Sequence, residues 1–187
     1  HLFSSAASDV YKRQIKYRED HIFLDPRNIE LGARLVTNLE KLYLSLKKLN
    51  LKSSDKKEYY NLSHSVGIPQ NNTDKLQNKI FGIECNFDEL NAIDFKKGCY
   101  VGQENTARIK LKNKLNKRLL PIEILQGELE SDLITLDNDE IGKVLINEDN
   151  AFAIIKIKNE KFNFDKTFDC GSAKIKVKKP NWLQITS

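Results

Sequence analysis

The sequence predicts an α+β protein that ends in a small antiparallel β-barrel. After about residue 117, short apolar stretches alternate with turn residues, and residues 174–178 alternate strictly between lysine and an apolar residue. Before that point, a strand-like segment is followed by segments of helical character. We therefore expect three parts: a leader at 1–14, a mixed domain at 15–115 and a barrel at 116–187.

The mixed domain contains segments with distinct local signals. Residues 17–24 are rich in strand-forming side chains and end at Asp25-Pro26, while 29–34 reads as a loop or short turn. Residues 38–50 carry five leucines in an imperfect stripe that fits either a helix or a strand. Two helices are expected, one over 53–64 with Ser53 or Ser54 as its N-cap, and one over 103–108.

The predicted barrel strands share apolar density and β-branched residues. They cover 118–125, 132–136, 141–146, 151–158 and 174–178. Turn-forming residues separate them at 137–139, 147–150 and 170–172. Five or six strands at this spacing predict a closed antiparallel barrel, because closure removes the unpaired edges of the sheet.

Composition excludes several classes of protein. The chain has 187 residues, of which 40% are hydrophobic and 30% charged, and no apolar run approaches the roughly 20 residues that span a bilayer. Its three cysteines, Cys85, Cys99 and Cys170, are too few and too irregularly spaced for a disulfide framework, which indicates a reducing compartment. They also lack the spacing of a zinc or iron–sulfur ligand set, so we expect no metal site.

The most informative feature is the octapeptide Lys97-Gly98-Cys99-Tyr100-Val101-Gly102-Gln103-Glu104. It places Cys99 between two glycines, just ahead of the predicted helix. A helix N-terminus and neighbouring lysines both favour the thiolate form of a cysteine. The alternative is a small buried core thiol, which describes most isolated cysteines.

This octapeptide is similar to the signature of the YgfZ family. Two further segments resemble the family in order and spacing: Asp25-Pro26-Arg27 with Gly32 and Arg34, and the basic-then-apolar run 117–121. A third, at Glu84, Asn86 and Asp88, matches in part. These relatives are folate-binding proteins, related to the glycine cleavage system T protein, that assist iron–sulfur cluster maturation. The resemblance implies that 15–115 is the C-terminal part of a T protein-like folate-binding domain.

The resemblance also implies roles for individual residues. Tetrahydrofolate would lie in a groove between the two domains, close to Cys99 as the catalytic thiol. The implied cofactor-binding residues are Lys97, Gly98, Tyr100, Gly102, Gln103, Glu104 and Arg108. Simpler explanations remain open. Gln103 and Glu104 fit an ordinary first helical turn, Tyr100 fits a core position, and Arg108 fits a solvated helix face.

Positive charge is concentrated at 96–118. This segment has eight Lys or Arg and one acidic residue, a local charge of +7 against +5 for the whole chain. A solvated surface is the simplest explanation. If the segment is extended, however, Lys110, Lys112 and Lys114 project from one side and could attract the glutamate tail of a folate or an RNA backbone.

The first fourteen residues resemble a translated sequencing-adapter read and lack the apolar segment of a secretory signal. We interpret residues 1–14 as a non-native, disordered leader. On this interpretation the chain is truncated upstream of about Ile15 and lacks most of one lobe of the family's folate domain.

Together, these observations favour a folate-binding accessory protein rather than an enzyme. It would support maturation or repair of four-iron, four-sulfur proteins, including tRNA-modifying enzymes, in the bacterial cytoplasm. Its expected partners are folate and iron–sulfur client or assembly proteins, with weak RNA contact through 96–118 and no membrane, and we expect a monomer. The alternatives are a tetrahydrofolate-dependent aminomethyltransferase and an RNA-binding module.

Overall fold

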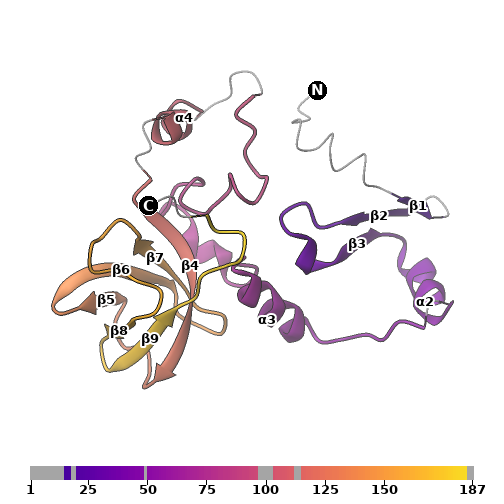
Figure 1. Cartoon of the computed structure of the whole chain (residues 1–187). Helices are drawn as coiled ribbons and strands as arrows, with labels where there is room; N and C mark the ends of the chain where they lie inside the picture. Colours follow the sequence, from indigo (N-terminus) through magenta and orange to yellow (C-terminus); the bar gives the residue numbers. More distant parts are fainter. Residues whose placement is uncertain (1–14, 18–19, 49, 97–102, 112–114, 185–187) are drawn as a thin grey trace.

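The computed structural model describes residues 15–17, 20–48, 50–96, 103–111 and 115–184. The predicted leader at 1–14 lies outside these residues. In Figure 1 the barrel, the helix α4 and a small N-terminal sheet form three separate regions, with the helix α3 between the sheet and the barrel.

The C-terminal region is a closed barrel of six antiparallel strands, as predicted. The strands are paired around the barrel in the order β4-β7-β6-β5-β8-β9. Their bounds are β4 Lys117–Gln126, β5 Leu133–Leu136, β6 Asp139–Ile146, β7 Phe152–Lys156, β8 Thr167–Cys170 and β9 Ala173–Val177. The sequence did not reveal β8, whose four residues offer only Phe168 and Cys170 to the interior.

The strand β4 is buried on both faces along its first half. Leu120 and Ile122 lie in the barrel core, whereas Leu119 faces outward and packs against Cys85, Ile146 and Phe152. Alternate residues of a strand point to opposite faces, so two separate clusters contact one strand. The outer cluster joins the barrel to the segment that precedes α4.

The N-terminal sheet is an antiparallel meander of β1 (Ile15–Tyr17), β2 (Asp20–Leu24) and β3 (Ala33–Val36). A short 3-10 helix, η1 (Ile29–Leu31), connects β2 to β3, so the predicted loop at 29–34 contains a helical turn and the start of a strand.

The leucine-rich segment at 38–50 forms the helix α2 (Leu39–Lys48), which settles the choice between helix and strand. None of its residues is buried, and the exposed fraction of Leu44 is 69%.

The N-cap of the helix α3 (Lys56–Val66) lies one residue after Ser54, the nearer of the two predicted caps. Asp55, not Ser53 or Ser54, is the N-cap, and its carboxylate accepts from the Lys57 amide. Gly67 ends the helix in the left-handed conformation that favours glycine. The C-terminal end contacts the barrel region, because Trp182 Nε1 donates to the Val66 carbonyl at 2.7 Å.

The 3-10 helix η2 (Thr73–Leu76) and the helix α4 (Gln103–Leu111) complete the fold. Lys110 lies within α4, so the prediction that it belongs to an extended strip of lysines is wrong. Lys112 and Lys114 lie outside the described residues. Within the described ranges, no helix has the length and apolar character needed to cross a membrane.

Candidate functional site

The structure describes only part of the site that the sequence predicts. Five of its residues lie outside the described ranges: Lys97, Gly98, Cys99, Tyr100 and Gly102. Gln103 and Glu104 form the start of α4, but their side chains are not described. Arg108 is exposed on α4, as the solvated-face alternative requires. The functional roles of these residues therefore stay predictions.

Next to α4, a buried asparagine joins the preceding segment to the barrel. Asn86 is 1% exposed, and its carboxamide donates to the Leu119 carbonyl at 2.8 Å and accepts from Arg118 Nη1 at 3.1 Å. The Leu119 amide in turn donates to the Glu84 carbonyl at 2.8 Å. Asn86 adopts a positive φ of 64°, which asparagine tolerates better than most residues. The partial family match at 84–88 is therefore the segment that docks on β4.

Arg118 and Glu89 form a largely buried ion pair beside Asn86. Arg118 Nη2 lies 2.5 Å from Glu89 Oε1, and the side chains are 11% and 21% exposed. Among the described residues, Arg118 Nε and Glu89 Oε2 are buried without a hydrogen-bond partner. Buried polar groups are normally paired, so this donor and this acceptor point to a polar ligand or to water.

Both residues line a cavity of about 280 Å³ between α4, the segment 83–89 and the ends of β4 and β7. Its remaining lining residues are Ile83, Asp88, Ile109, Lys110, Leu115, Ile157, Lys158 and Gln184. The volume is near the lower limit for small-molecule sites. Four apolar residues line the cavity beside six polar or charged ones, and the unpartnered donor and acceptor belong to two of these, a combination that suits a flat heterocycle with both N–H and carbonyl groups.

Lys110 is held at this cavity from two sides. Its ammonium group lies 2.7 Å from Asp88 Oδ2 and 3.9 Å from the centre of the Phe95 ring. The ion pair and the cation–π contact position α4 against the segment that leads toward the octapeptide. The sequence marked Lys110 only as part of a basic run. Its spatial partners could not be read from local spacing.

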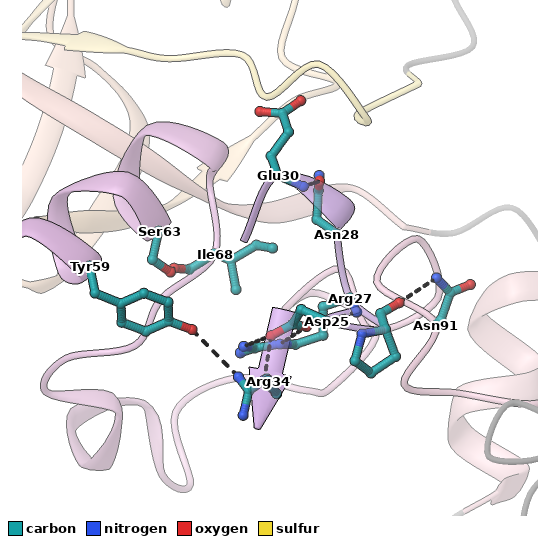
Figure 2. A network of polar contacts seen from close by, with 10 residues as sticks. Asp25, Arg27, Asn28, Glu30, Arg34, Tyr59, Ser63, Ile68 and Asn91 are labelled. Carbon is teal, nitrogen blue, oxygen red and sulfur yellow. Dashed lines mark hydrogen bonds and ion pairs between the residues drawn. The ribbon is translucent and has the colours of Figure 1, made fainter. Parts of the chain in front are cut away.

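A second polar cluster lies in the segment 25–34, which carries part of the family resemblance (Figure 2). Asp25 is 4% exposed, and its carboxylate accepts from Arg27 Nε at 3.0 Å, Arg27 Nη2 at 2.7 Å and Arg34 Nε at 2.7 Å. Arg34 Nη2 also donates to the Tyr59 hydroxyl at 3.4 Å. One carboxylate therefore connects β2, β3 and, through Tyr59, the helix α3.

Electrostatics keep Asp25 ionised. Burial by itself raises the pKa of Asp25, but the hydrogen bonds from Arg27 and Arg34 outweigh burial and lower it to about 2 from 3.8. The same contact with Asp25 raises the pKa of Arg27. The adjacent Pro26 carbonyl accepts from Asn91 Nδ2 at 3.0 Å, which attaches this cluster to the segment before the octapeptide. The arrangement acts as a structural clamp.

The two cysteines that the structure describes are unsuited to thiolate chemistry. Burial, followed by the charge of Glu84, raises the pKa of Cys85 to about 11. Burial also raises the pKa of Cys170, whose thiol donates to the Ser131 carbonyl at 2.9 Å. Both thiols therefore remain protonated near neutral pH.

Comparison with known proteins gives one match to a family model and several to curated relatives. Residues 116–185 match the model described as CAF17, C-terminal beta-barrel domain. The iron–sulfur cluster assembly factor IBA57 homolog, mitochondrial, of Dictyostelium discoideum is 32% identical over 130 residues, covering 69% of this chain and 32% of that protein. The Neurospora crassa homolog is 36% identical over 97 residues, covering 52% and 22%. The Mus musculus protein is 33% identical over 105 residues, covering 56% and 28%. This chain thus spans a third or less of the length of these relatives.

These relatives support the resemblance to iron–sulfur cluster assembly factors, but not its finer assignment to the YgfZ family. They also correct two expectations. The predicted cytoplasmic location is contradicted because the relatives are named as mitochondrial proteins, and a bacterial source is unsupported because the relatives come from eukaryotes.

Proposed function

We propose that this chain belongs to a mitochondrial iron–sulfur cluster assembly factor and that the cavity beside α4 binds the pterin ring of a folate. The names of the relatives support the assembly role. The observation that carries the ligand proposal is the buried, unpartnered pair formed by Arg118 Nε and Glu89 Oε2. In this proposal four-iron, four-sulfur proteins, including enzymes that modify tRNA, are the clients.

The chemistry of a pterin matches the groups at this site. The ring presents N–H donors and a carbonyl acceptor at neighbouring positions, which would pair with the carboxylate of Glu89 and the guanidinium of Arg118. A cavity of about 280 Å³ holds a bicyclic ring but not a whole folate. The glutamate tail of the cofactor would therefore lie outside the cavity, in which Lys110 is already paired with Asp88.

When bound, tetrahydrofolate supplies a carrier for one-carbon units. The residues of this chain would bind and orient it: Asn86 fixes Arg118, and Arg118 fixes Glu89. Cys99 remains the proposed functional thiol on the strength of the octapeptide. The aminomethyltransferase alternative is not favoured, because none of the relatives described above is named as a transferase.

A chimaera tests the assembly role. Residues 15–185 would replace the matching part of the Dictyostelium relative, in cells depleted of their own mitochondrial factor. We expect aconitase, a four-iron, four-sulfur enzyme, to recover its activity. The substitution Cys99→Ala should abolish the recovery, while Cys170→Ala, at a buried barrel thiol, is the matched control. Soluble chimaera without recovery would contradict the assembly role, and full recovery with Cys99→Ala would contradict the role of the thiol.

Ligand binding is tested on the chain itself. Tetrahydrofolate should quench the fluorescence of Trp182, the single tryptophan, which lies two residues before Gln184 of the cavity. Glu89→Gln keeps the shape of the side chain and should weaken binding about tenfold, because a charged hydrogen bond is lost. Lys174→Gln, on β9 outside the cavity, should leave the affinity unchanged. Equal affinity for all three proteins would refute the pterin site.

A further inference from the structure

A second and larger cavity, of about 580 Å³, lies on the barrel at β6 and β7 and shares no lining residue with the cavity beside α4. Its walls carry five lysines from four elements or their flanks. Lys75 belongs to η2 and Lys79 follows it, while Lys117, Lys143 and Lys156 come from β4, β6 and β7. We call this cavity the lysine pocket. Because the pocket lies between η2 and the barrel, only the tertiary structure brings its lining residues together.

Close packing of the two strands forms one wall of the lysine pocket. A Cβ atom at Gly142 on β6 would lie 2.4 Å from the Ile154 carbonyl oxygen on β7. No side chain fits there, and glycine allows this close approach of the two strands. Val144, Leu145 and Ile154 add apolar surface to the lining. The pocket thus combines an apolar wall with cationic side chains, as small-molecule sites commonly do.

Positive charge in the pocket exceeds negative charge. Two carboxylates, Asp132 and Glu140, face the five lysines, which leaves a net charge of +3. Glu140 pairs with Lys156 at 2.9 Å, and Asp132 lies 3.7 Å from Lys143. Lys75 is bound by Glu148, which lies outside the lining, at 2.6 Å and by the carboxamide of Asn147, a lining residue, at 3.0 Å.

Two lysines carry the excess charge. Among the described residues, no carboxylate lies within ion-pair distance of Lys79 or Lys117. The pKa of Glu140 shows the resulting field, because it is lowered first by the hydrogen bond from Lys156 and further by the charges of Lys117 and Lys143. An anion at the pocket would meet two ammonium groups that internal pairs do not neutralise.

We propose that the lysine pocket binds a compact small molecule that carries two or more phosphate or carboxylate groups. A single exposed ammonium group contributes little, so a useful affinity needs several anionic groups on one ligand. Lysine suits both kinds of anion, because its ammonium group acts as a point charge. The pocket therefore recognises multiple negative charge, and phosphate and carboxylate ligands are its two sources.

The lining argues against an extended nucleic acid. Among the described residues, the lining contains no aromatic side chain on which a base could stack, and stacking is a main source of affinity for single strands. Asp132 and Glu140 also repel a phosphate backbone that runs across the pocket. This inference is independent of the proposed folate site.

Calorimetric titration of the full chain with tripolyphosphate, and separately with citrate, tests the proposal. The variant Lys79→Gln/Lys117→Gln should bind at least one probe about tenfold more weakly than the unmodified chain. The variant Lys174→Gln/Lys178→Gln removes the same charge outside the pocket and should bind within about twofold of it. Glu140→Gln should bind more tightly, because it removes a repulsive charge. Circular dichroism spectra would establish that all variants are folded.

The outcomes separate the two ligand sources and the competing explanations. Stronger binding of tripolyphosphate identifies phosphate as the preferred group, and stronger binding of citrate identifies carboxylate. Equal losses in both double variants would show a general effect of net charge and overturn the site. The proposal would also be overturned if neither probe bound. Tighter binding of a single-stranded RNA decamer, with the same dependence on Lys79 and Lys117, would overturn the restriction to small molecules.

Discussion

Asp25→Asn keeps the shape of a buried side chain and removes the charge that holds two arginines. The carboxylate accepts hydrogen bonds from the Arg27 amide and from the guanidinium groups of Arg27 and Arg34. An asparagine presents one acceptor oxygen, and its NH₂ group would face a guanidinium donor. The substitution should therefore destabilise the link between β2 and β3.

Its magnitude follows from the pKa of Asp25. The difference between the ordinary pKa of 3.8 and about 2, at about 1.4 kcal/mol for each pKa unit, corresponds to about 2.5 kcal/mol. The Arg34 side chain is 45% exposed, so water screens part of its contribution. We therefore expect the free energy of unfolding to fall by about 2 kcal/mol, which lies within the range of about 1.5–3 kcal/mol for one hydrogen bond to a charged group.

The sign of the pH dependence is defined. The pKa is lower in the folded chain than in the unfolded chain, so this stabilisation is fully present above pH 3.8 and is lost as the pH falls through about 2. In Asp25→Asn this part of the acid dependence should disappear. Carboxyl NMR titration of the unmodified chain measures the pKa of Asp25 directly.

Amide hydrogen exchange provides a local assay. The Asp25 amide donates to the Gly32 carbonyl at 2.9 Å, across the turn that the clamp closes. A loss of about 2 kcal/mol should accelerate its exchange about thirtyfold at neutral pH. Asp149→Asn, at an exposed pair 3.4 Å from Lys57, is the control and should change little. An exchange rate within about threefold of the unmodified chain, or a titration of Asp25 near 3.8, would refute the reasoning.

Three further predictions concern the contacts with the barrel region. Arg118→Met leaves Glu89 buried without its cation and should lower the free energy of unfolding in urea by about 3 kcal/mol. The double variant Arg118→Met/Glu89→Leu should restore most of this loss, and no recovery would argue against the ion pair as the cause. Gly67→Ala should lower the free energy of unfolding by about 2 kcal/mol, because the φ of Gly67 is 83° and the new Cβ would lie 2.3 Å from Pro180 Cγ. An unchanged urea midpoint would contradict this prediction. His64 Nε2 donates to the Ala151 carbonyl, and burial lowers the pKa of the imidazole below 6.5. The neutral ring therefore stabilises the fold, and this stabilisation is lost as the pH falls below 6.5 and through the lowered pKa of His64. His64→Gln should flatten the stability profile between about pH 7.5 and pH 5, and an unaltered profile would exclude His64 as its source.

Local signals in the sequence were sufficient for most elements of the barrel. The alternation at 174–178 identified β9, and the apolar density at 151–158 identified β7. These patterns depend on neighbouring residues in one strand, so a single sequence contains them. By contrast, β8 has four residues and pairs with β5 only at Thr135 and Asp169, so its strand character depends on β9 beside it.

The sequence by itself determined that a barrel follows a mixed segment and that an unusual cysteine octapeptide runs into the start of a helix, α4. The tertiary structure alone decided which charges meet. Arg118 pairs with Glu89 across 29 positions, and Lys75 pairs with Glu148 across 73. Lys110 contacts Asp88 and does not belong to an extended strip of lysines, because the chain is helical at this position in α4. Periodicity describes only which face of an element a residue occupies, whereas ion pairs and cavities depend on how the loops bring separate elements together.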